Sequence, residues 1–243
     1  MAIPSVLQIR TAQVVRVHRV TPEVFLLELA LAAEDRFAFQ AGQWVYLHLL
    51  NDAGEPLARG AFSIASAPSE AGETLLFGIN IYGQLTASLA ELSVGSRVGV
   101  QGPFGVFVLP SEKAPLVLLA GGIGITPLRS LAREALDRGW SEPIHLLWAS
   151  KTQEDLLYHE DFETWAKAYP KTFFYHPTLT RDPHPEWKGE RGRVDEEKLQ
   201  ALAVDWERVH AFVCGPEAFM AQTRQLLQVR GIVGKPRLHE EKF

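Results

Sequence analysis

The chain has 243 residues, of which 47% are hydrophobic and 22% charged, and its formal net charge is −5. The apolar fraction is sufficient for real cores, and the negative charge argues against nucleic acid as a partner, because polyanions bind basic surfaces. The single cysteine, Cys214, excludes an internal disulfide, a zinc site held by cysteines and an iron–sulfur cluster held by cysteines.

The N-terminus, MAIPSVLQIR, lacks the apolar core of a signal peptide, and no apolar run reaches membrane-spanning length. We therefore expect a cytoplasmic protein with no membrane insertion. The histidines show no spacing that is typical of a metal site, so we expect no bound metal.

The first part of the chain, from residue 5 to about residue 110, is typical of short strands separated by Gly, Pro and Asp. The expected strands cover residues 13–20, 24–29, 44–49, 62–65 and 75–81, and one helix is expected over 86–92. Many strands at short intervals predict an antiparallel β-barrel.

The pattern changes from Pro115 onward, where apolar strands alternate with helices. The expected strands are 116–120, 144–149, 173–176, 209–213 and a last extended stretch at 237–243. The expected helices begin at Thr126, at about Thr152, near Glu196 and at Pro216. This alternation predicts a parallel sheet. We therefore expect a two-domain fold of the β plus α/β class. An antiparallel β-barrel covers residues 1–110, and a Rossmann-like domain with a parallel sheet covers residues 111–243.

A glycine-rich loop joins the first strand of the second domain to its first helix. It holds Gly121, Gly122 and Gly124, with Thr126 suited to the N-cap and Pro127 to the first helical position. Such a junction directs backbone N–H groups and a helix N-terminus toward an anion such as a pyrophosphate. Pro127 replaces the third glycine of G-x-G-x-x-G, so close packing of helix on strand is the alternative interpretation.

The next two strands of this domain end in hydroxyl groups and cations. Ser150 and Lys151 follow one strand, and Thr180 and Arg181 follow the other. A site for NAD usually places Asp or Glu at the end of the second strand, whereas these groups suit a 2′-phosphate. The pattern favours NADPH over NADH, and ordinary surface cations are the alternative.

The barrel half carries a second candidate anion site. Gly83, Gln84, Leu85 and Thr86 resemble the start of a helix, with Thr86 as a possible cap. Phosphate sites in two domains indicate either two nucleotides or a nucleotide donor and a flavin.

Several short segments, in order along nearly the whole chain, carry a family resemblance. They are FQAGQWV at 39–45, FSIAS at 62–66, GQLT at 83–86, GPFG at 102–105, GGIGITP at 121–127, CGP at 214–216 and EKF at 241–243. Through these segments the chain resembles the ferredoxin–NADP reductase superfamily, in which a flavin-binding barrel precedes a pyridine-nucleotide domain.

The resemblance implies FAD, rather than FMN, in the barrel and NADPH or NADH in the second domain. Ser63 would lie near flavin N5, and Cys214 and Glu241 beside the nicotinamide, with Phe243 over the flavin face. The remaining residues implied to contact a cofactor are Phe62, Ile64, Ala65 and Ser66 along the flavin, Gly83, Leu85 and Thr86 at its phosphates, Gly121, Gly122, Gly124, Thr126 and Pro127 at the pyrophosphate, and Gly215 and Pro216 after Cys214.

One departure from the family concerns its Arg-x-Tyr-Ser strand. Gly60 stands at the arginine position, Arg59 lies one residue early, and Phe62 replaces the tyrosine. A shift of one residue turns a side chain to the opposite face of a strand, and a bulge at Gly60-Ala61 would restore its direction toward the flavin phosphate. We expect Arg59 to be a phosphate ligand on that condition, and FAD to be bound less tightly than usual.

The implied function is a flavin-dependent oxidoreductase that passes hydride from NAD(P)H to FAD and then electrons to a separate acceptor protein, such as a ferredoxin, a flavodoxin or an oxygenase component. One alternative is reduction of a small acceptor, either free flavin or a quinone. The others are an electron-transfer subunit of a larger complex and a redox-inert binding module.

Overall fold

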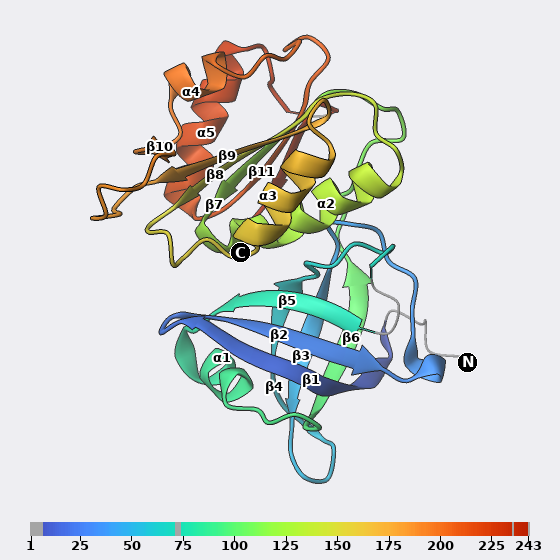
Figure 1. The fold of residues 1–243 in the computed structure, drawn as a ribbon. Coiled ribbons are helices and arrows are strands. Elements are labelled where there is room, and N and C mark those ends of the chain that lie inside the picture. Colours follow the sequence, from blue (N-terminus) through green and yellow to red (C-terminus); the bar gives the residue numbers. More distant parts are fainter. Residues whose placement is uncertain (1–6, 71–73, 235, 243) are drawn as a thin grey trace. The chain divides into compact units, whose positions relative to one another are not determined.

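The structure is a computed structural model that describes residues 7–70, 74–234 and 236–242. The described residues form two compact units. The first contains the residues up to Val108 together with Arg129–Glu134, and the second contains Leu109–Leu128 and the residues from Ala135 onward. Figure 1 shows the elements of both units, and each unit is described by itself below.

Within the described residues, the first unit holds one six-stranded sheet in the order β4-β3-β6-β1-β2-β5, with antiparallel neighbours. The elements are β1 (Ile9–Thr21), β2 (Val24–Leu31), β3 (Trp44–Leu50), β4 (Pro56–Ser63), β5 (Thr74–Asn80), α1 (Gly83–Ala90) and β6 (Arg97–Phe104), with a short 3-10 helix at Ala33–Asp35. Strands such as β2 bury alternate side chains, as expected when one face of a sheet covers a core.

The two ends of this sheet meet, which makes it a barrel. The Ala65 N–H, just after β4, donates to the Leu76 carbonyl on β5 over 2.8 Å. The strands curve around one another in Figure 1. The core inside includes Phe25, Val45 and Phe77, none of which is exposed.

The second unit holds a six-stranded sheet, within the described residues, in the order β10-β9-β8-β7-β11-β12 with all neighbours parallel. Its strands are β7 (Leu116–Gly121), β8 (Ile144–Ser150), β9 (Phe173–Leu179), β10 (Glu190–Arg191), β11 (His210–Cys214) and β12 (Leu238–Glu241). Its helices are η3 (Gly122–Gly124), α2 (Ile125–Asp137), α3 (His159–Ala168), α4 (Glu196–Gln200) and α5 (Glu217–Val229).

Helices cover both faces of this sheet. Residues of α4 and α5, including Leu199 and Met220, pack on one face of β7, whereas α2 and α3 lie on the other face in Figure 1. Every residue of β7 and β8 is therefore buried. Strand β7 is a continuous apolar run, and β8 is apolar except for His145 and Ser150. The predicted fold class, an antiparallel barrel and a parallel-sheet unit, is confirmed.

Three predicted helix starts are wrong. Helix α1 begins at Gly83 rather than Thr86, α2 at Ile125 without Thr126 as its N-cap, and α3 at His159 rather than near Thr152. In the last case the Asp155 carboxylate accepts hydrogen bonds from both the N–H and the hydroxyl of Thr152, which closes a separate turn instead of capping a helix. A single 3-10 turn, η3, leads directly into α2, so the helix begins at Ile125, before the expected first helical position at Pro127.

Three parts of the strand prediction also need correction. No strand was expected over 97–104, where β6 lies between β3 and β1. The strand expected at 62–65 is β4, which begins at Pro56 and ends at Ser63. Strand β9 extends to Leu179, and the two-residue strand β10 beside it is missed by the sequence pattern. No helix in the described part of the chain has both the length and the apolar character needed to cross a membrane.

Candidate functional site

The carboxyl edge of the parallel sheet gathers most of the residues predicted to bind a nucleotide. Gly121 ends β7, Ser150 ends β8, Cys214 ends β11 and Glu241 ends β12. Strand order reverses between β7 and β11, because the chain proceeds from β7 to β10 on one side and continues with β11 on the other. Ligands of open α/β sheets bind at such a reversal, outside the carboxyl ends of the strands.

The three glycines of the loop after β7 have different roles. A Cβ on Gly124 would lie 2.2 Å from the Cys214 carbonyl oxygen, and one on Gly121 would lie 2.7 Å from the Phe219 ring. Close packing therefore explains these two glycines. Gly122 instead has a φ of +53°, with no atom within 4 Å of a Cβ placed on it, so its backbone borders open space.

Contacts around Gly122 hold this loop in place. The Trp148 indole N–H donates to the Gly122 carbonyl over 2.9 Å. Thr126 is buried, and its hydroxyl donates to the Ile123 carbonyl over 2.9 Å; Pro127 is buried beside it. These two side chains complete the turn, so what the loop offers a ligand is its backbone N–H groups at the start of α2.

Cys214 and Glu241 lie opposite each other in the register of β11 and β12, which brings together the two residues expected beside a nicotinamide. Burial and the nearby Glu241 carboxylate raise the pKa of the Cys214 thiol well above its usual value. Burial also raises the pKa of Glu241. The cysteine is thus a neutral thiol at neutral pH, and it lacks the thiolate character of a nucleophile. Phe243, expected over the flavin, lies outside the described residues.

The CGP segment continues from Cys214 into α5. A Cβ on Gly215 would lie 3.0 Å from Gly121 Cα, so the ends of β11 and β7 pack closely at this point. Pro216 takes the N-cap position of α5. These two residues shape the edge of the sheet next to the glycine loop.

Lys151 and Arg181 are neighbours on adjacent strand ends. The Arg181 N–H donates to the Lys151 carbonyl and the Thr180 N–H to the Ser150 carbonyl, each over 2.9 Å, and both cationic residues are exposed. Ser150 differs from the prediction, because it is 4% exposed and its hydroxyl donates to the Asp155 carbonyl. The pair of cations, rather than the serine hydroxyl, is presented at this edge.

Arg193 extends this row and was missed by the sequence reasoning. The Gly192 N–H donates to the Leu179 carbonyl over 2.9 Å, which places the residue after it beside the end of β9. Arg193 is exposed. The only sequence signal was the Arg-Gly-Arg segment at 191–193, which has little meaning until the two-residue strand β10 is known.

In the first unit, β4 and α1 approach each other at Gly60. A Cβ on Gly60 would lie 2.9 Å from the Leu85 methyl group and 3.0 Å from the Phe62 ring. Gly60 and Phe62 face the barrel core together, since they pair with the buried Leu47 and Val45. The family's arginine would therefore require Leu85 to move.

Arg59 faces away from this contact. Its guanidinium lies 4.3 Å from the centre of the Tyr46 ring and donates to the Gln101 side chain over 3.3 Å. The described register of β3 and β4 shifts only between Leu49 and Leu50. The bulge expected at Gly60-Ala61 is therefore wrong, and the structure does not bring Arg59 to the face of Phe62.

Ser63 is the last residue of β4 and pairs with Trp44. After it, Ile64 and Ala65 are fully buried, and the Ser66 hydroxyl accepts a hydrogen bond from the Leu76 N–H over 3.2 Å. These three residues contact other parts of the first unit, and their side chains help to close the barrel.

The start of α1 is an open backbone cradle. Gly83 has a φ of +68°, and no atom lies within 4 Å of a Cβ placed there. The first N–H groups of a helix have no partner within the helix, so they suit a phosphate. Thr86 is only 1% exposed; its hydroxyl accepts from the Tyr82 N–H over 2.7 Å and donates to the Tyr82 carbonyl. Thr86 holds the turn before α1 and does not cap the helix.

These features fit a flavin in the first unit and a nicotinamide dinucleotide in the second, because each unit has one open glycine cradle at a helix start. No group of three or more His, Cys, Asp or Glu side chains suited to a metal ion occurs in residues 7–70, 74–234 and 236–242.

Comparison with known protein families supports this assignment. Residues 11–109 match the oxidoreductase FAD-binding domain, and residues 118–225 match the oxidoreductase NAD-binding domain. Ferredoxin–NADP reductase B of Sorangium cellulosum is 33% identical over 236 residues, which are 94% of each chain. The glycine betaine monooxygenase reductase subunit of Pseudomonas aeruginosa is 33% identical, over 85% of this chain and 57% of its own length.

Solved structures have the same fold. A cytochrome P450 reductase from Amycolatopsis superimposes with a TM-score of 0.83 at 28% identity, covering 97% of this chain and 70% of its own. A ferredoxin–NADP reductase from Neisseria gonorrhoeae, solved with FAD and NADP, gives a TM-score of 0.81 at 22% identity over 96% and 98% of the two chains. The chain belongs to the ferredoxin–NADP reductase superfamily, and it is an NAD(P)H-dependent flavoprotein reductase that uses FAD.

Proposed function

We propose that NADPH is the hydride donor and that the electrons leave for a separate iron–sulfur protein or oxygenase component. Bound FAD supplies the chemistry that links a two-electron donor to a one-electron acceptor. The chain's own residues bind and orient the two cofactors. The observation that carries the donor assignment is the pair of exposed cations, Lys151 and Arg181, whose backbones are hydrogen-bonded at adjacent strand ends.

The proposed flavin site is formed by β4 and α1. The N–H groups of Gly83 and Leu85 would hold the phosphates, with the backbone of Phe62 and Ser63 along the ring system. Arg59 lies outside this proposed set, because its guanidinium packs over Tyr46 on the other face of β4.

The proposed donor site is the carboxyl edge of the parallel sheet. The backbone at Gly122 would bind the pyrophosphate, while Cys214 and Glu241 would lie at the nicotinamide end. Lys151 and Arg181, with Arg193 next in the row, would bind a 2′-phosphate through charge-assisted hydrogen bonds.

The donor assignment is tested with Lys151→Ala and Arg181→Ala in the full chain. Each variant should raise the KM for NADPH about tenfold or more and leave the KM for NADH nearly unchanged, because only NADPH carries the 2′-phosphate. Lys171→Ala, which removes an exposed cation just before β9, is the matched control. Equal effects on both nucleotides would end the assignment of a 2′-phosphate site.

The names of the relatives support the proposed acceptor. They include a ferredoxin–NADP reductase and reductase components of a monooxygenase and of terephthalate 1,2-dioxygenase. We further propose a domain boundary at residues 110/111, a cytoplasmic location and no role in nucleic-acid binding, the last because of the net charge of −5.

Reduction of free flavin is a second candidate function, and Gly60 favours it. The face of β4 that carries Phe62 has no arginine at this position, so one phosphate contact of the family is missing. A weakly held flavin would exchange as a substrate. Loss of most FAD during gel filtration, together with turnover that rises with added free flavin, would support this candidate; a fully loaded protein would exclude it.

A further inference from the structure

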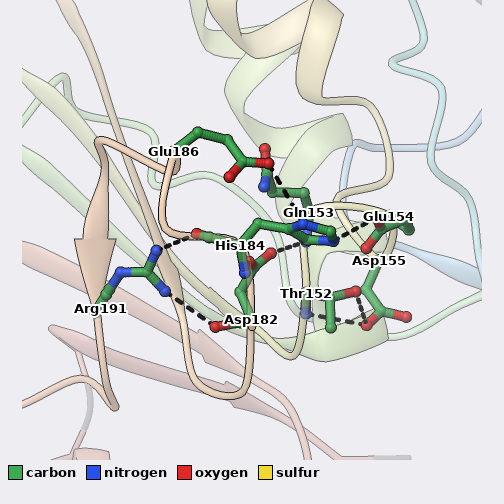
Figure 2. Close-up of polar contacts among 8 residues, drawn as sticks. All are labelled: Thr152, Gln153, Glu154, Asp155, Asp182, His184, Glu186 and Arg191. Carbon is green, nitrogen blue, oxygen red and sulfur yellow. Dashed lines mark hydrogen bonds and ion pairs between the residues drawn. The ribbon is translucent and has the colours of Figure 1, made fainter.

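Two loops at the carboxyl edge of the parallel sheet are joined by one carboxylate. The loop after β8 and the loop after β9 meet at Asp182, as Figure 2 shows. One Asp182 oxygen accepts the Gln153 N–H over 2.9 Å, and the other accepts the His184 N–H over 2.7 Å. The side chain thus links a backbone group of the neighbouring loop to a backbone group of its own loop.

Asp182 is ionised in this arrangement. Partial burial opposes the charge, but the hydrogen bonds from His184 and Gln153 outweigh it, so the pKa of Asp182 lies below its ordinary value. Hydrogen bonds to an ionised acceptor are about twice as strong as neutral ones. The link between the loops is therefore stronger than an ordinary loop contact.

This link stands next to the two cations of the proposed donor site. Lys151 is two residues before Gln153, Arg181 is directly before Asp182, and the Arg181 N–H donates to the Lys151 carbonyl. The backbones of Lys151 and Arg181 are thus held by two cross-links, one directly between them and one through the Asp182 carboxylate. A displacement of either loop would change the separation of the two positive groups.

Other contacts brace the same two loops. Asp155 accepts from the N–H and hydroxyl of Thr152 within the first loop. Arg191, at the end of β10, donates to the Asp182 and His184 carbonyls in the second. Figure 2 shows Arg191 bonded to the turn at Asp182 and His184, and Thr152 and Asp155 bonded to each other.

Two further carboxylates in this region make no such link. Glu154 and Glu186 lie 3.8 Å and 3.3 Å from the two ring nitrogens of His184, and both are largely exposed. They provide a comparison, since they carry the same charge as Asp182 but, within the described residues, accept no backbone N–H from the opposite loop.

We propose that Asp182 is a positioning residue that sets the spacing of Lys151 and Arg181 for a phosphate on the ribose of the hydride donor. The proposal rests on the proposed NADPH site and adds a residue to it. It runs against simple electrostatics: a carboxylate near a phosphate site should weaken phosphate binding, so removing it should tighten binding. If Asp182 instead positions the two cations, removing its carboxylate should weaken phosphate binding.

The test uses Asp182→Asn and Asp182→Ala in the full, FAD-loaded protein, with Glu186→Gln as the matched control. Asparagine keeps one acceptor oxygen and alanine keeps none. We expect the KM for NADPH and the dissociation constant of NADP⁺ to rise about threefold in Asp182→Asn and about tenfold in Asp182→Ala. The turnover number and the KM for NADH should change little, and Glu186→Gln should leave NADPH binding equal or slightly tighter.

The outcomes separate this inference from the proposed donor site. If Lys151→Ala weakens NADPH but both Asp182 variants bind it equally or more tightly, the positioning role is wrong and the donor site stands. If the Asp182 variants lose affinity for NADPH and NADH equally, Asp182 has a general structural role, and this result would also overturn the inference. If Lys151→Ala and Arg181→Ala have no effect on NADPH, the donor site itself fails, and the positioning role fails with it.

Discussion

At the scale of single residues, a shift of the arginine by one position along β4 changes the face of the strand that carries the positive charge. Arg59 and Gly60 are adjacent, so they face opposite sides of the strand. Arg59 stacks on Tyr46, an interaction worth about 0.5–1 kcal/mol at an exposed site. Gly60 faces Leu85 of α1, with no room for a branched side chain. The cation and the space next to the helix are therefore on different faces.

This difference predicts opposite results for two neighbouring substitutions. Arg59→Ala should retain FAD, because its guanidinium contacts Tyr46 and Gln101 rather than the face of Phe62. Gly60→Val should release most FAD, because its side chain would collide with Leu85 and the Phe62 ring. The measurement is the ratio of flavin to protein absorbance after gel filtration, with thermal unfolding as a check on folding. Loss of FAD from Arg59→Ala alone would place Arg59 back in the site.

The sequence identified the residue types of the candidate site better than their individual roles. It marked Gly121, Gly122 and Gly124 as one motif, but only the fold separates them, because Gly124 packs against the carbonyl of Cys214, which is far away in the chain. Thr86 has the right chemistry for a cap, yet its hydroxyl bonds back to Tyr82. Such partners are set by tertiary structure, which a local pattern does not contain.

At the scale of elements, the buried central strands of the parallel sheet were predicted well, whereas β6, β10 and several helix starts were not. Strand β7 is apolar throughout, and β8 is apolar except for His145 and Ser150. Burial on both faces of a sheet produces such a pattern directly. Helix α3 begins at His159 because Asp155 and Thr152 form a turn of their own first. Asp and Thr favour turns and helix caps equally, so their spacing alone does not decide between the two.

Strands β8 and β9 also carry a buried pair of histidines. His145 is 4% exposed, its Nδ1 lies 3.1 Å from His176 Nε2, and its ring stacks on Phe174. Within the described residues its Nε2 has no hydrogen-bond partner. Burial, and secondarily His176, lowers the pKa of His145 to about 4. Burial also lowers the pKa of His176, although Glu190 opposes this.

The histidine pair predicts acid sensitivity of the second unit. The unfolded chain binds a proton near the ordinary pKa of 6.5, above the folded value, so the free energy of unfolding falls as the pH falls from 6.5 toward 4. The loss is about 3 kcal/mol for His145. His145→Phe should flatten this dependence in denaturant unfolding at pH 7 and pH 5, whereas His18→Gln, at an exposed site, should not. An unchanged slope in His145→Phe would contradict the assignment.

At the scale of the whole molecule, two kinds of hydrophobic pattern predicted the two architectures. Strands such as β2 bury alternate side chains because only one face of their sheet covers a core. Strand β7 buries every residue because both faces of its sheet are covered. A local hydrophobic pattern does not predict the order of the strands or the link between two loops through Asp182. Both depend on which segments, distant in the sequence, meet in the fold. Family motifs in order along the chain supplied the cofactors that the patterns alone left open.

The most direct test of the central claim is an anaerobic stopped-flow record of the flavin absorbance after mixing the FAD-loaded protein with NADPH or with NADH. We predict rapid bleaching by an equimolar amount of NADPH, with slower or weaker bleaching by NADH. A protein that remains colourless with added FAD, or a bound flavin that neither nucleotide bleaches, would contradict it.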